Sequence, residues 1–348
     1  YPTSAALRHI LSRMPTSLSD YRLMQGLFTG LRALWLCVAC GWLVPASSEA
    51  AETLWLQLKW AHAFQFAGYY AADAKGYYRE AGLDVQLIEA APDTDVVGRV
   101  TAGEAEFGIG TSNLLLDRHA GRPVMALAAI FQHSPQVILA RHDDKLQSVH
   151  DLKGKRLMLE QQSGELLAYL QREGLRREAL QLLPHNFDAN SLMAGSTDAL
   201  SAYQIFEPFL LDQRQFPYIQ LSPRAAGIDF YGDVLFTSEA QYLRHRERTQ
   251  AFVTASLRGW EYATEHPDEI IALIRARYPD RRSAEHLKFE AEKSIPMIRN
   301  DLVPIGYMHR GRWQHIADTY AEIGMLPPGF NFDGFLPTKT WLTPPTRM

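Results

Sequence analysis

Short apolar runs alternate with stretches of helical periodicity along most of the chain after residue 52. Runs that are continuously apolar, or that alternate apolar with polar residues, predict strands, whereas apolar residues three and four apart predict helices. In the first part of the chain the predicted strands are residues 53–58, 83–88, 105–109, 124–130 and 136–140. The helices predicted between them are residues 66–81 and 96–101. This order of strand, helix and strand predicts a largely parallel sheet with helices on both faces.

A second cycle of the same kind begins near residue 148, and a long helical region follows it. The strands predicted in this cycle are residues 156–159, 180–183, 199–203 and 218–221, with a helix at 164–173. From residue 238 onward the spacing predicts the helices 238–245, 247–266, 267–277, 283–293 and 310–324. We therefore expect an α/β fold with two lobes, each a mostly parallel sheet flanked by helices, and a ligand cleft between the lobes.

The order of these elements also predicts where the lobes begin and end. We expect residues 51–142 and 229–335 to form the larger lobe, residues 143–228 the smaller lobe, and residues 336–348 a surface tail. The chain would then cross twice between the lobes. Two lobes joined by such crossings can close around a small molecule by hinge motion.

The N-terminal region has the layout of an export signal. A 12-residue apolar run at 33–44 follows Arg22 and Arg32, and small residues occupy positions 45–50. Such a run is short for a membrane span. We expect residues 1–50 to be a signal peptide cleaved after Ala50, with residues 1–23 upstream of the signal itself. An uncleaved N-terminal anchor and a lipoprotein signal at Cys40 are the alternatives, and membrane contact is expected only through this segment.

Composition and charge exclude several classes of protein. The chain has 348 residues and a formal net charge of −4, without runs of Lys or Arg, so a nucleic-acid partner is not expected. The two cysteines, Cys37 and Cys40, lie inside the predicted signal, which excludes a disulfide scaffold or a cysteine-based zinc site in the mature protein. The phosphate-binding loop, dinucleotide-binding, nucleophile-elbow and HExxH motifs are all absent. The sequence therefore predicts no catalytic residue, no metal and no cofactor.

Aromatic and polar residues gather where the predicted strands end. Trp60, Phe66 and Tyr69 follow the first strand, and such rings could stack on a planar heterocycle. The other candidate ligand-binding residues are Thr111, Ser112, Ser163, Gly164, Glu165, Tyr203, Glu207, Asp229 and Tyr231. Each group also has a structural alternative: the rings as helix core, the Ser and Thr residues as helix N-caps, and the acids as parts of a turn or hinge.

Several segments resemble one family of substrate-binding proteins. The segments 68–72, 75–78 and 82–85, together with 107–110 and 151–155, are similar to carriers of thiamine pyrimidine precursors and to alkanesulfonate binders, of which thiamine pyrimidine synthase is a relative. The resemblance spans residues 53–335. It implies a type II periplasmic-binding-protein fold with the ligand held between the lobes.

A narrower resemblance suggests a different role for the same fold. The segments 131–135, 222–232 and 305–308 are similar to extracytoplasmic sensor domains attached to diguanylate cyclases or histidine kinases. The chain would then be the ligand-sensing part of a signalling protein, and its partner would be an output domain.

The third possibility is a synthase. The synthase pattern W-x-P-N-x-x-H-x-G, aligned on Trp60 and Gly68, places Phe66 at the histidine position. Such an enzyme would carry pyridoxal phosphate on Lys59 or Lys75. Because the pattern is broken, the leading hypothesis is a periplasmic solute-binding protein that captures a small planar metabolite, a thiamine pyrimidine precursor, for an ABC transporter, with the permease as its protein partner. The sensor domain and the thiamine-biosynthesis enzyme are the alternatives.

Overall fold

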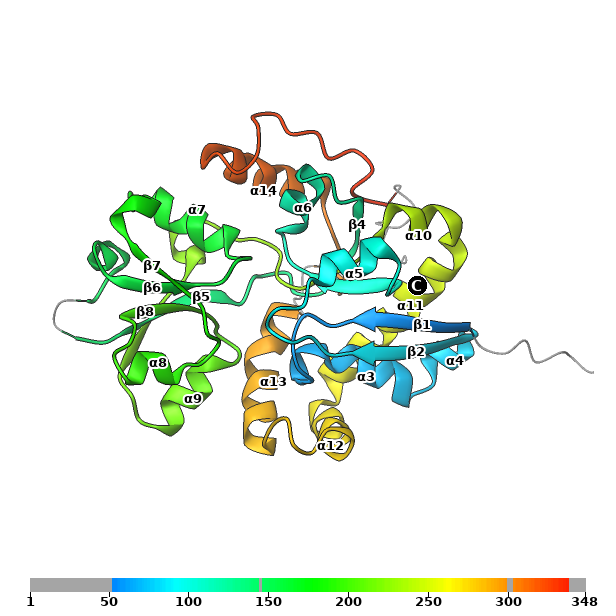
Figure 1. The fold of residues 1–348 in the computed structure, drawn as a ribbon. Helices are drawn as coiled ribbons and strands as arrows, with labels where there is room; N and C mark the ends of the chain where they lie inside the picture. The colour runs from blue at the N-terminus through cyan, green and yellow to red at the C-terminus, as the bar shows by residue number, and fades with distance from the viewer. Residues whose placement is uncertain (1–51, 144–145, 299–302, 338–348) are drawn as a thin grey trace, which may run out of the picture. The chain divides into compact units, whose positions relative to one another are not determined.

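The computed structural model describes residues 52–143, 146–298 and 303–337. The predicted signal peptide, and all but the first two residues of the predicted tail, lie outside these residues. Within them, ten strands form two five-stranded sheets, and helices pack around both (Figure 1). The two-lobed α/β fold expected from the sequence is confirmed.

The first sheet belongs to the lobe that holds both ends of the described chain. Its strands are β1 (Glu52–Gln57), β2 (Leu83–Ile88), β3 (Phe107–Gly110), β4 (Val124–Ala129) and β10 (Val234–Ser238). Their order is β2-β1-β3-β10-β4, with β1 parallel to β2 and β3. β10 runs antiparallel to both of its neighbours.

The second sheet forms the second lobe. Its strands are β5 (Gln136–Arg141), β6 (Arg156–Leu159), β7 (Gln181–Pro184), β8 (Ala199–Tyr203) and β9 (Tyr218–Leu221), in the order β7-β6-β8-β5-β9. β6 is parallel to β7 and β8, whereas β5 is antiparallel to β8 and β9. The lobe limits expected from the sequence stay a prediction. The sheet pairing differs from them at β5, which was expected in the larger lobe and pairs in the second sheet.

Most of the predicted helices are present, whereas the short helices α6 (Leu114–His119), α8 (Asn190–Met193) and α9 (Glu207–Gln213) were not predicted. The other helices are α3 (Ala67–Ala74), α4 (Tyr77–Glu80), α5 (Val96–Ala102), α7 (Gly164–Arg172), α10 (Glu239–Arg244), α11 (Arg246–Glu265), α12 (Pro267–Arg277), α13 (Ala284–Ile298) and α14 (Arg310–Glu322). The single helix predicted at 66–81 is divided at Gly76, whose φ of 78° is left-handed. β10 was not predicted, because a short apolar run beside a helix start does not distinguish the two structures.

The helices α3 and α11 cross at close range in the core. Gly68 and Gly259 face each other there, and a Cβ atom at residue 259 would overlap the carbonyl oxygen of Gly68 and lie 2.7 Å from the amide nitrogen of Ala72. The side chain of Trp260 occupies the space that a Cβ at residue 68 would need. Two glycines thus set the distance between these helices.

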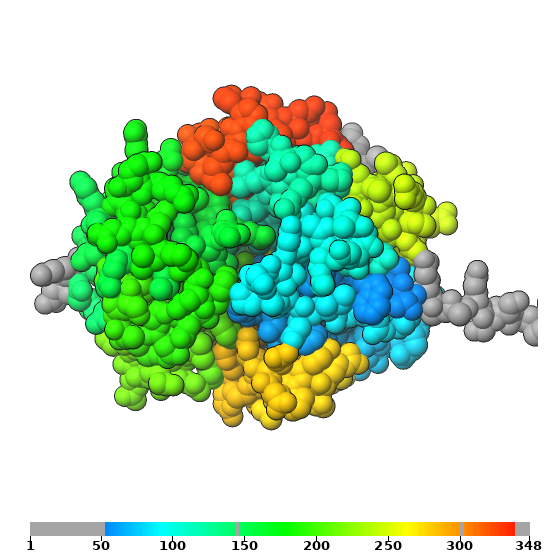
Figure 2. All heavy atoms as spheres, viewed as in Figure 1, coloured from blue at the N-terminus to red at the C-terminus, as the bar shows by residue number. Residues whose placement is uncertain are grey.

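A buried apolar cluster extends from one sheet to the other. It includes Leu114 and Tyr320 of the first lobe and Ile138 and Leu166 of the second. Figure 2 shows one face of the molecule, on which green atoms of the second lobe meet cyan atoms of the first. None of the helices in the described parts of the chain is both long and apolar enough to cross a membrane.

Candidate functional site

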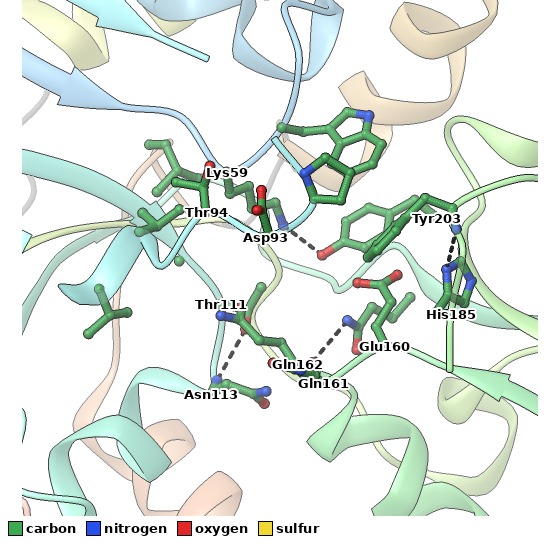
Figure 3. Close-up of a pocket in the computed structure, with 18 of the residues that line it drawn as sticks. Lys59, Asp93, Thr94, Thr111, Asn113, Glu160, Gln161, Gln162, His185 and Tyr203 are labelled. Atoms are coloured by element: carbon green, nitrogen blue, oxygen red, sulfur yellow. Dashed lines mark hydrogen bonds between the residues drawn. The ribbon is translucent and has the colours of Figure 1, made fainter. Parts of the chain in front are cut away.

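A cavity of about 1000 Å³ lies where loops of the two lobes meet. Its walls come from the loops after β1, β2 and β3 in the first lobe and after β6, β7 and β8 in the second. These are the carboxyl ends of the parallel strands in each sheet, where ligands of open α/β sheets bind. Figure 3 shows side chains from both sets of loops turned toward this space.

Lys59 connects the two lobes across this cavity. Its Nζ donates to the hydroxyl oxygen of Tyr203 at the end of β8 at 2.6 Å (Figure 3). The same Nζ forms an ion pair with Oδ1 of Asp233, also at 2.6 Å. Nε2 of Gln65 donates to Oδ2 of the same aspartate at 2.8 Å. Burial alone would lower the pKa of Lys59, but Asp233 and Tyr203 outweigh it and hold the pKa above its usual value. Lys59 is therefore an ammonium group.

Three glutamates line the same cavity, of which Glu290 is buried and Glu160 and Glu207 are half-buried. Burial raises the pKa of Glu160 to about 7, against the opposing charge of Lys59. Burial likewise raises the pKa of Glu207 to about 8, although its carboxylate accepts a hydrogen bond from the Tyr203 N–H at 2.8 Å. Glu290 has a pKa raised to about 7 by burial. The cavity therefore holds three acids that titrate close to neutral pH.

Two aromatic rings from different lobes meet at the cavity. The ring centroids of Trp60, after β1, and Phe187, after β7, lie 5.3 Å apart with an interplanar angle of 40°. Phe187 has a left-handed φ of 57°, a conformation that costs a non-glycine residue about 1–2 kcal/mol. Nδ1 of His185 accepts a hydrogen bond from the Phe187 N–H at 2.9 Å, and its Nε2 donates to the carbonyl of Ser201 at 2.8 Å. The loop thus uses a neutral histidine, whose pKa burial lowers, to hold the ring in place.

Four of the residues that the sequence predicted as ligand contacts line the cavity: Trp60, Thr111, Tyr203 and Glu207. Their contact with a ligand stays a prediction. Phe66 and Tyr69 do not line it: both are buried in the core of the first lobe, where Tyr69 packs edge-on against Trp260 at 5.5 Å. The proposed stacking role of these two rings is corrected to one of core packing, because α3 turns Tyr69 toward α11 and Phe66 is fully buried just before α3.

The remaining six predicted residues lie outside the cavity wall, and their contact with a ligand stays a prediction. Asp229 and Tyr231 lie on the segment that returns from β9 to β10, and Ser112 follows β3. Oγ of Ser112 donates to the Tyr231 carbonyl at 2.8 Å, and the Tyr231 hydroxyl accepts from the His309 N–H at 3.0 Å. Asp229 accepts from Nδ1 of His133 at 2.8 Å. These contacts hold the returning chain segment in place.

The start of α7 is packed in the same region. Ser163 and Glu165 are buried, and a Cβ at Gly164 would lie 2.9 Å from both Oδ1 of Asn113 and Cε1 of Tyr320. This segment packs against the first lobe, and its contact with a ligand stays a prediction.

Several residues that line the cavity were not predicted from the sequence as ligand contacts. Lys59 and Glu160 adjoin segments that it singled out, so their position at strand ends was a usable signal. Phe187 and Glu290 gave no such signal, because only the packing of a loop and of α13 brings them to the cavity. In the described ranges, no three His, Cys, Asp or Glu side chains are grouped as a metal site requires.

The fold has close counterparts among solved structures. The alkanesulfonate-binding protein SsuA from Xanthomonas axonopodis pv. citri, bound to MOPS, superposes with a TM-score of 0.61 at 16% identity, covering 80% of this chain and 96% of the other. Neighbours of this kind have the periplasmic-binding-protein fold. At this level of identity the similarity establishes the fold alone.

Sequence relatives cover most of the chain. The riboflavin-binding protein RibY of Chloroflexus aurantiacus is 26% identical over 325 residues, which is 85% of this chain and 92% of the relative. The formylaminopyrimidine-binding protein of Halalkalibacterium halodurans is 22% identical over 297 residues, or 82% and 90% of the two chains. The family model described as NMT1/THI5 like matches residues 63–270, more than half of the chain. The chain therefore belongs to the NMT1/THI5-like family.

Proposed function

We propose that this protein is an exported binding protein for a small planar nitrogen heterocycle of the pyrimidine class, which it captures in the periplasm and delivers to the permease of an ABC transporter. The observation that carries the proposal is the pair of rings, Trp60 and Phe187, that meets at the cavity from the two lobes. A planar ligand that stacks on these rings gains energy from each of them. Because the two rings already lie 5.3 Å apart, the lobes must open to admit the ligand between them.

The size and polarity of the cavity support the same proposal. Ligand pockets usually have volumes of about 300–1000 Å³, with apolar walls and a few polar groups that fix orientation. Here Thr111, Tyr203 and Glu207 supply polar groups around the rings. Two relatives are named for binding nitrogen heterocycles, riboflavin and formylaminopyrimidine.

The charge state of the lysines favours binding over the synthase alternative. A lysine forms a Schiff base only as a neutral amine. Lys59 is held as an ammonium by Asp233 and Tyr203. Lys75 lies outside the cavity wall and pairs with Glu269 at 2.8 Å. Neither lysine is prepared to attach pyridoxal phosphate.

Calorimetry tests the ligand class. The purified protein is titrated with formylaminopyrimidine, 4-amino-5-hydroxymethyl-2-methylpyrimidine, riboflavin and, as an anionic comparison, MOPS. We expect one pyrimidine per chain and no heat from MOPS. Absence of binding by every heterocycle would refute the proposal.

Uptake measurements separate delivery from sensing. Deletion of the gene is expected to abolish uptake of radiolabelled pyrimidine at low concentration. Unchanged uptake, with ligand binding intact, would contradict the transport role and favour the ligand-sensing domain expected from the sequence as an alternative.

The ring pair gives a direct prediction. Replacing Trp60 by alanine is expected to weaken pyrimidine binding at least about tenfold, because one stacking surface and its buried apolar area are lost. Trp55→Ala is the matched control, since Trp55 is 42% exposed on β1 and does not line the cavity. Titration calorimetry of both variants, alongside their thermal unfolding, makes the comparison. Equal affinities in the two variants would place the ligand elsewhere.

A further inference from the structure

The cavity wall has an excess of acidic groups. Six acids line it: Asp93, Asp95, Asp117, Glu160, Glu207 and Glu290. Its two strong bases, Lys59 and Arg122, are already engaged. Lys59 pairs with Asp233, and Nη1 of Arg122 lies 2.6 Å from Oδ1 of Asp95. The charge that remains on the wall is therefore negative.

Two of these acids face the cavity without an ion pair, although Lys59 lies near Glu160 and Arg282 near Glu207. Across the parts of the chain that the structure describes, neither Glu160 nor Glu207 forms an ion pair with Lys, Arg or His. The Glu207 carboxylate accepts the Tyr203 N–H, and Figure 3 shows Glu160 beside the Tyr203 ring at the cavity. A carboxylate removed from water without a counter-charge is unfavourable, and a bound cation relieves that cost.

Glu290 is a third glutamate on the same wall. Its side chain is 2% exposed, yet Oε1 makes no hydrogen bond in the described residues. The nearest charged group is the guanidinium of Arg282, with Nε 3.5 Å away. Buried polar atoms in native proteins almost always have a partner. Arg282 is the partner of Oε1 here, because the two atoms lie within ion-pair distance of each other.

Aromatic faces surround the same acids. Trp60, Phe187, Tyr203 and Phe206 all line the cavity. The faces of such rings carry negative electrostatic potential and attract organic cations, as carboxylates do. Rings and unpaired acids in one cavity therefore select for the same property of a ligand, namely positive charge on a partly apolar body.

We propose that the ligand of this cavity is an organic cation: a nitrogen heterocycle bearing an ammonium group that Glu160 and Glu207 receive between the aromatic rings. This inference rests on the proposed function and adds the charge of the ligand to it. It also predicts that an anionic sulfonate is rejected here, because the acids of the wall would repel it.

A matched set of ligands tests the charge. The 5-aminomethyl, 5-hydroxymethyl and 5-carboxyl derivatives of 4-amino-2-methylpyrimidine share one ring and differ in charge at one substituent. At pH 8.5 we expect calorimetry to give at least about tenfold tighter binding for the aminomethyl than for the hydroxymethyl compound, as charge-assisted hydrogen bonds are the stronger ones. The carboxylate is expected to bind most weakly.

Isosteric variants assign the effect to the two glutamates. Glu160→Gln and Glu207→Gln are each expected to reduce the affinity ratio of the aminomethyl to the hydroxymethyl compound several-fold, while the affinity for the hydroxymethyl compound stays within about twofold. Glu292→Gln, an exposed position on the same helix as Glu290, is the matched control and is expected to keep the full ratio. Thermal unfolding verifies that each variant is folded. If one glutamine variant does not fold, the other one still tests the inference.

The pH dependence gives a second readout. Because the pKa values of Glu160 and Glu207 are raised to about 7 and 8, both acids are partly protonated at neutral pH, so binding of the cation releases protons. Affinity for the aminomethyl compound is expected to fall as pH drops from 8.5 to 6, by up to about tenfold per unit for each proton taken up. The other charged or titratable groups facing the pair are Lys59, Tyr203, Asp233, His185, Arg282 and Glu290. Of these, Glu290 titrates in the same range, and the glutamine variants separate its contribution.

The possible failures are distinguishable. Equal affinity for the aminomethyl and hydroxymethyl compounds at pH 8.5, or a full ratio in both glutamine variants, would overturn the cation inference and leave the proposed function in place. No binding by any heterocycle of either set would remove both.

Discussion

Replacing Lys59 by methionine is expected to lower the free energy of unfolding by about 3–5 kcal/mol at pH 8, the usual cost of removing one partner from a buried ion pair. The Lys59 and Asp233 side chains are 12% and 2% exposed, and their charged atoms lie 2.6 Å apart. Without the ammonium, Asp233 keeps only the hydrogen bond from Gln65 to offset the loss of water. Urea unfolding of the variant and the natural protein measures the difference.

The pH dependence of this loss identifies its cause. Burial already raises the pKa of Asp233, and Lys59 opposes that shift. In the Lys59→Met variant this opposing charge is absent, so the pKa of Asp233 in the folded state rises further above its value in the unfolded state. A carboxyl with a raised folded pKa loses stability as pH increases, so the defect should be smaller at pH 5 than at pH 8. The double variant Lys59→Met, Asp233→Asn is expected to recover most of the loss. A defect of equal size at both pH values, without recovery, would contradict the ion-pair explanation.

Replacing Gly259 by valine is expected to destabilise the protein by about 3 kcal/mol or more. The new side chain would overlap the Gly68 carbonyl and press on the backbone of α3 at Ala72, and neither can move without shifting a helix. Overpacking relieved by flexible side chains costs less than overpacking against backbone. Thermal and urea unfolding provide the measurement.

An exposed position on α11 supplies the control for this variant. Glu261 lies two residues from Gly259 on the outer side of the helix, so Glu261→Ala keeps a favourable helix residue and is expected to change stability by less than about 0.5 kcal/mol. If Gly259→Val unfolded at the same urea concentration as Glu261→Ala, the helices would be farther apart than described.

The elements with strong local patterns could be predicted from the sequence. β8 and β9 have the predicted bounds, because both are apolar runs closed by turn residues. The bounds of α12 are also as predicted, since Pro267 marks its start. β10 was not predicted because its extended conformation depends on pairing with β3 on one side and β4 on the other. Such a long-range cause has no local signature in the sequence.

The candidate site was harder to predict for a related reason. Strand ends could be located, and Trp60 and Tyr203 with them, because ligands of α/β sheets bind beyond those ends. Which neighbours of a strand end face inward depends on helix rotation, so Phe66 and Tyr69 were misassigned. Phe187 reaches the cavity through a left-handed backbone that its own residue type disfavours.

The place of β10 also bears on how the nascent chain folds. The second sheet is complete once residue 221 has been synthesised, whereas the first lacks a central strand until residues 234–238 emerge. Until then β3 has one unpaired edge and β4 has no partner strand in the sheet, and open edges promote aggregation. The second lobe is thus expected to reach native-like structure first, while the earlier-synthesised half relies on a chaperone until its last strand arrives.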